Sequence, residues 1–237
     1  MGQMRAALLV DAPGSDVVDL MADAPAFNPR AAAYLLAAVT ESLPPEFVCA
    51  AVVDPGVGSR RRPIILRCGE RWFVGPDNGL LEIVARRSDE PSAWWEITWL
   101  PERLSKSFHG RDLFAPVAAR LAKDGERALE QLACRVEPDL RDYNHWPDDL
   151  EEVIYIDGYG NCMLGCRWPS NEEHLEVVTD SLRFGAATTF SDVPEGKAFC
   201  YENAMGLVEI AVNQGNAATQ MGLEIGTQVA VRKLSGK

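Results

Sequence analysis

Apolar, β-rich runs alternate with helical periods from the start of the chain to about residue 132, and this alternation predicts a layered α/β domain. Residues 47–53, FVCAAVV, are apolar without a break, which is typical of a strand buried on both faces of a mainly parallel sheet. The alanine-rich stretch 30–41 has a helical period. Further strands are expected at 17–20, 64–66, 72–74 and 94–100, and further helices at 78–86 and 112–123.

The pattern changes over residues 135–150. The segment RVEPDLRDYNHWPDDL is rich in charge and proline and has neither a helical nor a strand period, as is typical of an inter-domain linker. After it, short strand-like runs are separated by Gly, Asn, Asp and Pro, and a helix is expected only at 216–221. We therefore predict a Rossmann-like α/β domain over 1–134, a linker over 135–150 and a small β-barrel domain over 151–237. The strands expected in the second domain are 153–157, 175–178, 198–201, 207–212 and 229–234.

Composition narrows the classes of partner. The chain of 237 residues is 47% hydrophobic, enough for one large core or two modest ones. Its formal net charge of −12 would repel a phosphate backbone, and its densest basic run, residues 60–62, is short, so nucleic acid is not expected as a partner. No apolar stretch approaches the roughly 20 residues of a membrane helix, and no signal-peptide pattern is present. We therefore expect a cytoplasmic protein with no membrane partner.

The cysteines are expected to be structural. Most lie inside apolar runs, as buried reduced thiols do, and their spacing fits no zinc template. No metal site is therefore expected. The six cysteines are Cys49, Cys68, Cys134, Cys162, Cys166 and Cys200.

Polar, glycine-rich loops at strand ends are the first candidates for chemistry. Asp54 directly follows the strand expected at 47–53 and opens the loop PGVGSRR. Because ligands of open α/β sheets bind beyond the carboxyl ends of strands, this loop is a candidate site, although a plain turn with a capping aspartate explains the pattern equally well. In FVGPDNG, Asp77 or Asn78 is expected to cap the following helix.

A histidine marks the third candidate loop. His109, one of three histidines, lies between an aromatic residue and a glycine in FHGRD, just before a helix. A lone histidine is more often structural, but its place in a loop beside Arg111 and Asp112 favours a catalytic role.

Two further loops lie in the predicted second domain. Asp157 and Asn161 belong to IDGYGN, which is a ligand-binding loop or a hairpin turn. In IAVNQGNAA, a strand leads into a helix whose first amides are available to a ligand, unless Asn216 only caps that helix. Candidate loops in both domains indicate a site assembled at a domain or subunit interface, but their spacing does not name a substrate.

The segments VVDPGVGSRR, FVGPDNGLL, FHGRDLFAPVAARLA, IYIDGYGN and EIAVNQGNAA, in this order, closely resemble the S-adenosyl-L-methionine hydroxide adenosyltransferases, relatives of the fluorinase and chlorinase. The resemblance covers nearly the whole chain. It implies an enzyme that hydrolyses S-adenosyl-L-methionine to adenosine and L-methionine with no metal or cofactor. It further implies a homotrimer, in which the substrate lies between the α/β domain of one subunit and the β-barrel domain of its neighbour.

The resemblance also implies the roles of individual residues. Asp54, Arg61 and His109 would place and polarise a water that attacks C5′ of the ribose, in line with the departing sulfur. Arg61 would favour the hydroxide, and Asp54 and His109 would orient the water and accept its proton. Halogenation is not expected, because the DPGVG aspartate is present and the segment 81–109 is too short for the loop of the halogenating relatives. The residues expected to bind the substrate are Asp157 at the methionine amine, Asn161 at the adenine edge, Asn216, Ala217 and Ala218 at adenine, and Phe27 near the nucleoside.

The chain departs from the family at two places. Relatives begin with a strand and a Thr-Asp-Phe-Gly turn whose aspartate grips the ribose, whereas MGQMRA matches the middle of the helix that follows. We therefore expect an internal start, with Met1 in the place of a valine, and Asp11 is a poor substitute for the missing aspartate. Ala204 stands where relatives often carry a serine that contacts the methionine carboxylate. A truncated, inactive member that binds S-adenosyl-L-methionine or adenosine and a purely structural trimer are the competing hypotheses.

Overall fold

The structure, a computed structural model, describes residues 1–136, 143–170 and 175–234. The chain divides into two compact units, the first comprising Met1–Ala37 and Leu43–His145 and the second Ala38–Ser42 and Trp146–Lys237. Of the predicted linker over 135–150, residues 137–142 lie outside the described residues, whereas its two ends belong to strands of the two units.

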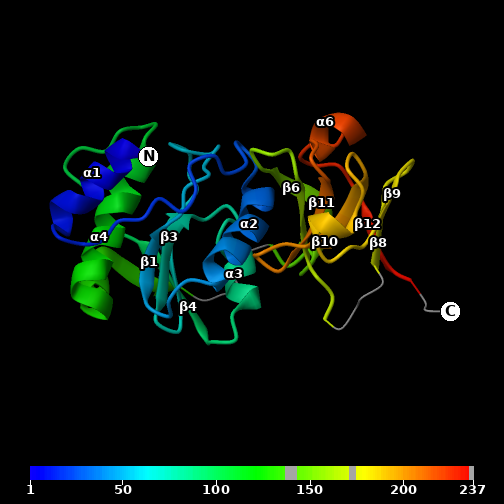
Figure 1. The fold of residues 1–237 in the computed structure, drawn as a ribbon. Coiled ribbons are helices and arrows are strands. Elements are labelled where there is room, and N and C mark those ends of the chain that lie inside the picture. Colours follow the sequence, from blue (N-terminus) through cyan, green and yellow to red (C-terminus); the bar gives the residue numbers. More distant parts are fainter. Residues whose placement is uncertain (137–142, 171–174, 235–237) are drawn as a thin grey trace. The chain divides into compact units, whose positions relative to one another are not determined.

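The first unit is built on a five-stranded sheet in the order β1-β3-β2-β4-β5, of which Figure 1 labels β1, β3 and β4. Only β1 and β3 pair in parallel, and the other three pairs are antiparallel, so the predicted mainly parallel, Rossmann-like sheet is wrong. The reason is local: Gly69 and Glu70 connect β2 to β3 as a tight hairpin, whereas parallel neighbours need a long crossover. The strands are β1 (Phe47–Ala50), β2 (Pro63–Cys68), β3 (Arg71–Pro76), β4 (Ser92–Ile97) and β5 (Ala133–Val136).

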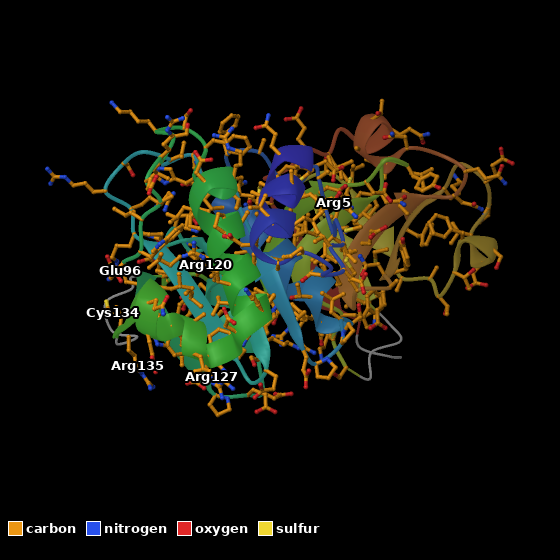
Figure 2. All side chains as sticks on the ribbon, turned by 90° about the vertical axis from the view of Figure 1, so that its left-hand side faces the viewer. Arg5, Glu96, Arg120, Arg127, Cys134 and Arg135 are labelled. Carbon is orange, nitrogen blue, oxygen red and sulfur yellow. The ribbon has the colours of Figure 1, made fainter. Side chains whose placement is uncertain are left out.

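One helix of the first unit carries much of its core. The buried side of α4 packs with the sheet residues Ile65, Val74 and Trp95. Helix α1 lies beside α4, as both views show, and Arg120 of α4, labelled in Figure 2, stacks over Trp99 at 4.0 Å. The helical elements are α1 (Gly2–Asp11), α2 (Pro29–Glu41), α3 (Glu82–Arg87), a π-helical turn η1 (Gly110–Phe114), α4 (Ala115–Asp124), the 3₁₀ turn η2 (Gly125–Ala128) and α5 (Leu129–Leu132).

Most predicted elements of the first unit are confirmed, with three corrections. The strand expected at 17–20 is absent, because residues 12–28 form turns and irregular structure. The strand expected at 47–53 ends at Ala50 and is only partly buried, since β1 pairs on one side alone and lies at the sheet edge. The helix expected from residue 78 begins at Glu82, after the turn that follows β3.

The second unit holds two antiparallel sheets, ordered β10-β11-β7-β6 and β12-β8-β9. Isolated bridges link them at Glu152 with Gln228 and at Ala186 with Cys200. Among the described residues, the predicted barrel is therefore not found as one closed sheet, because these junctions are single bridges instead of continuous ladders. The elements are β6 (Leu150–Ile156), β7 (Cys162–Arg167), β8 (Leu175–Val178), β9 (Arg183–Gly185), the 3₁₀ turn η4 (Phe190–Asp192), β10 (Ala198–Glu202), β11 (Leu207–Val212), α6 (Ala217–Met221) and β12 (Ala230–Lys233).

The predicted strands of the second unit and its helix α6 are confirmed, but β7 and β9 were not predicted. The core of this unit lies between its sheets, with Leu164, Val177 and Ile210 at its centre.

All six cysteines are free thiols, but only some are buried. Cys49 is half-buried and Cys134 is exposed on the edge strand β5 (Figure 2), whereas the other four are buried, as their apolar surroundings predicted for most of them. In the parts of the chain that the structure describes, no helix is both long and apolar enough to cross a membrane.

Candidate active site

The loop after β1 folds Arg61 back onto Asp54. Backbone bonds from Val57 to Asp54 (3.3 Å) and from Ser59 to Gly56 (3.0 Å) close two successive turns. Arg61 Nε then donates to both carboxylate oxygens of Asp54 at 2.9 Å, and Nη2 donates to Oδ2 at 2.5 Å. Only 4% of the Asp54 side chain and 9% of the Arg61 side chain are exposed. A forked, charge-assisted pair in this degree of burial holds both groups in one geometry.

His109 completes the cluster. Its Nδ1 lies 2.9 Å from Arg61 Nη2, and because a guanidinium can only donate, Nδ1 accepts this hydrogen bond. The imidazole is therefore neutral, with its proton on Nε2. Burial and the charge of Arg61 lower the pKa of His109, while Asp54 and Asp112 oppose this shift. The three residues, predicted from two separate segments, are thus brought together, with Arg61 also stacked over Phe114 at 5.1 Å.

The FVGPDNG segment supports this cluster. Arg62, the neighbour of Arg61, donates to Asp77 Oδ2 from Nε (3.0 Å) and Nη2 (2.6 Å), and Asn78 Nδ2 donates to the carbonyl of Val53 at 2.8 Å. The prediction that Asp77 or Asn78 caps the following helix is wrong, since that helix has Leu81 at its N-cap and no side-chain cap. Both residues instead fix the chain on either side of the loop that carries Asp54.

The loops that carry the cluster also pack directly against each other. Gly58 has a φ of +79°, and a Cβ there would lie 2.6 Å from the carbonyl oxygen of Lys106, in the segment that leads to His109. No L side chain fits so close to this carbonyl, which explains why the second glycine of PGVG is needed there.

In the second unit, Asp157 and Asn161 form one turn. Asp157 Oδ1 accepts from the amides of Tyr159 and Asn161, each at 2.9 Å, and Oδ2 accepts from Asn161 Nδ2 at 3.0 Å. The segment is thus an ordered turn, in agreement with the interpretation of IDGYGN as a hairpin turn. Because a carboxylate has about four acceptor positions, Asp157 Oδ2 retains capacity for a further donor.

The start of α6 packs on this turn. Asn216 caps the helix through Thr219 N at 2.7 Å, and a Cβ on Gly160 would lie 2.1 Å from the Asn216 Cγ. The amide of Ala218 donates to the Gly160 carbonyl at 3.0 Å and is therefore already engaged, and Ala217 is fully buried. The structure thus brings the predicted residues 157, 161 and 216–218 together in one unit.

A buried carboxylate stabilises the turn 203–206, which joins β10 to β11. Glu209, 2% exposed, accepts from the Tyr201 hydroxyl (2.5 Å) and from Asn203 Nδ2 (2.7 Å). Asn203 Oδ1 in turn accepts from the amides of Met205 and Leu207, both at 3.0 Å. Burial raises the pKa of Glu209, and sequence patterns missed this residue because a charged side chain inside a strand gives no periodic signal.

Exposed aromatic side chains complete the list of candidates. Phe27, predicted from the resemblance, is 83% exposed with a φ of +59°, and its unit contains the Asp54 cluster. Tyr159, which sequence reasoning missed, is 82% exposed beside Asp157, and its position between two glycines was the available signal. Within the described residues, no group of three or more His, Cys, Asp or Glu side chains is placed to hold a metal ion.

The fold and the cluster together define a two-unit α/β protein in which a buried Asp54–Arg61 pair contacts the half-buried His109. Family models described as the SAM hydroxide adenosyltransferase N-terminal and C-terminal domains match residues 1–133 and 151–230, respectively. The chain therefore belongs to the S-adenosyl-L-methionine hydroxide adenosyltransferase family.

Relatives and solved structures agree with this assignment. The (R)-S-adenosyl-L-methionine hydrolase of Salinispora arenicola is 38% identical, over 93% of this chain and 87% of the relative. A protein of the same name from Thermus thermophilus is 36% identical, over 95% of this chain and 91% of the relative. A solved structure of an uncharacterised conserved protein from Thermotoga maritima has a TM-score of 0.83 at 28% identity, and covers 98% of this chain and 94% of its own.

Proposed function

We propose that this chain hydrolyses S-adenosyl-L-methionine to adenosine and L-methionine, with Asp54, Arg61 and His109 holding the attacking water. The observation that carries the proposal is the buried contact of Arg61 with both Asp54 and His109. The names of the relatives, (R)-S-adenosyl-L-methionine hydrolases, support the activity.

The chemistry follows from the charges in the cluster. The water oxygen forms a bond to C5′, the C5′–S bond breaks, and the sulfur leaves with the electron pair as the neutral thioether of methionine. Asp54 accepts the proton of the water, because its carboxylate has about four acceptor positions and Arg61 occupies only three, whereas the single acceptor of neutral His109, Nδ1, is engaged by Arg61. The Arg61 charge stabilises the developing hydroxide, and the Nε2–H of His109 is free to orient it. The sulfonium is a good leaving group by itself, so we propose a reaction without metal or cofactor.

The second unit supplies the remaining contacts in this proposal. Asp157 Oδ2 accepts from the methionine amine, and the side-chain oxygen Oδ1 of Asn161 accepts from the adenine edge. Asn216 and Ala218 contact adenine, while the fully buried Ala217 packs behind them in the core. Phe27 covers the nucleoside.

We further propose that residues 1–134 and 151–237 act as two domains joined by 135–150, the second of them barrel-like. The bridges at both edges of its two sheets support this description. The protein is proposed to be cytoplasmic, with no nucleic-acid or membrane partner, in keeping with its net charge of −12.

The direct test is incubation of the purified chain with S-adenosyl-L-methionine and separation of the products by chromatography. Adenosine and methionine in equal amounts are expected. Binding of the substrate without either product would show an inactive binding protein instead, and neither binding nor product would leave only a structural role.

The proposed homotrimer, in which each site joins the first unit of one subunit to the second unit of its neighbour, makes a quantitative prediction. Asp54→Asn and Asp157→Ala chains are each expected to be inactive alone. Co-expressed chains should regain activity at about a quarter of the sites of randomly mixed trimers, because only there do two intact halves meet. A trimeric mass by light scattering is the control, and a mixture as inactive as its components would contradict shared sites.

A further inference from the structure

Asp112 is a well-anchored carboxylate that the reaction described above does not use. It lies on the π-helical turn three residues after His109, and its side chain is 14% exposed. Its Oδ2 accepts from the amide of Ser105 at 2.9 Å, and Arg111 donates to Oδ1 from Nε (2.5 Å) and to Oδ2 from Nη2 (3.0 Å). A single carboxylate therefore closes the loop of residues 105–112 across His109.

Arg111 extends this connection to the first helix. Its guanidinium stacks over Phe108 at 4.9 Å, and Nη1 donates to Gln3 Oε1 in α1 at 3.0 Å. The preceding residue, Gly110, leaves room for Met4 of α1, whose sulfur would lie 3.1 Å from a Cβ at that position. The backbone on the C-terminal side of His109 is thus held against α1 by two adjacent residues.

The other end of the Asp112 connection reaches the catalytic loop. Ser105, which Asp112 anchors, is followed by Lys106, whose carbonyl oxygen occupies the space that a Cβ of Gly58 would need. Because Gly58 lies between Asp54 and Arg61, the segment that Asp112 holds is packed on the loop of these two residues. A shift of this segment would change the distance between Arg61 and His109.

The backbone conformation at this point is unusual as well. The amide of Ala115 bonds to the carbonyl of Gly110, five residues back, whereas that of Asp112 bonds to Phe108, four residues back. Such π-helical turns are rare and occur frequently at functional sites. Asp112, whose carboxylate accepts from Ser105, lies within this turn.

We infer that Asp112 is a positioning residue for His109, which fixes the loop on which the imidazole sits and keeps a negative charge beside it. This inference rests on the proposed role of His109 in holding the attacking water.

The charges around His109 predict the direction in which its pKa should change when Asp112 is replaced. Arg61, Asp54 and Asp112 are the charged groups that act on the imidazole, and Arg111 partly neutralises Asp112. Burial and Arg61 lower the pKa of His109, while Asp54 and Asp112 raise it. Removal of the Asp112 charge must therefore lower the pKa of His109 further, and His109 would stay neutral to a lower pH.

The test is an NMR titration of histidine-labelled protein, in which His109 is assigned among the three histidines by loss of its signal in His109→Gln. In Asp112→Asn, the His109 midpoint should move to lower pH, because the amide can still accept from Ser105 but carries no charge. The acid limb of the pH–rate profile should move in the same direction. With the loop loosened, kcat should fall about tenfold with little change in KM.

The matched control is Asp149→Asn in the second unit. Asp149 accepts from the backbone amide of Arg167 (2.9 Å) and from its guanidinium (2.9 and 2.6 Å), the same combination of donors that Asp112 binds. This variant should leave the His109 titration and kcat unchanged. Arg111→Gln, at a more exposed side chain, serves as a second variant and should raise the His109 midpoint, because Asp112 then loses its counter-charge.

An unchanged His109 midpoint in both Asp112→Asn and Arg111→Gln would overturn the inference. The titration needs no turnover, so its result is independent of whether the chain hydrolyses S-adenosyl-L-methionine. Shifted midpoints in a protein without hydrolysis would refute the proposed function and leave the link between Asp112 and His109 intact.

Discussion

Asp54→Asn should reduce kcat for hydrolysis of S-adenosyl-L-methionine by about 10³-fold, the scale of a lost general base. Asparagine has the same shape and can still accept a hydrogen bond from Arg61, but its neutral amide cannot take the proton of the water. KM should change little, because Asp54 acts on the water and not on the substrate. Steady-state kinetics with detection of adenosine measure both constants.

Asp11→Asn is the control for this substitution, since Asp11 is a partly exposed aspartate of the same unit, 3.5 Å from Arg120. It should leave kcat unchanged. If Asp54→Asn retained more than about a tenth of the wild-type kcat, Asp54 would not be the proton acceptor.

Arg61→Met should remove activity and also destabilise the fold, by about 3–5 kcal/mol, the usual cost of a buried charge that has lost its partner. The charge in question is Asp54, whose side chain is 4% exposed and whose donors in this pair all belong to Arg61. Methionine keeps much of the side-chain volume over Phe114 without the charge. Urea unfolding at neutral pH measures the loss of stability.

A double substitution separates the two effects. Arg61→Met combined with Asp54→Asn removes both charges and should recover part of the lost stability, but none of the activity. Arg62→Met is the neighbouring control: Arg62 also pairs with a buried aspartate, Asp77 (8% exposed), but 28% of the Arg62 side chain is exposed. Water therefore reaches this pair more easily, and the loss of stability should be smaller than for Arg61→Met. Equal losses for Arg61→Met and Arg62→Met would contradict the account of a buried catalytic pair.

The elements that sequence patterns predicted well are those with a strong periodic signal. Helix α2 and strands β2, β3 and β11 were found near their observed ends because their apolar residues are long, regular runs. The pairing of these strands was not predictable in the same way. The apolar run 47–53 has the composition of a central strand, yet its place in the sheet depends on the hairpin at Gly69 between β2 and β3. The periodicity of apolar residues does not reveal such pairing.

Individual site residues were predictable where a motif isolates them. Asp54 and His109 were candidates from the loop pattern, whereas Arg61 came from the family resemblance. In the structure the three side chains meet although 48 positions separate Arg61 from His109. Asp112 and Glu209 were not assigned a role, because their effect depends on which amide or hydroxyl each carboxylate reaches in three dimensions. Ala217 shows a further limit of motifs, since the resemblance gives the residue but not its burial, and its side chain is fully buried in the structure.

The origin of the oxygen in the product tests the central claim most directly. Hydrolysis of S-adenosyl-L-methionine in heavy-oxygen water should place the label in the 5′-hydroxyl of adenosine and leave methionine unlabelled, as mass spectrometry of the two products would show. Label in an amino-acid product alongside methylthioadenosine, or adenosine without label, would contradict attack of water on C5′.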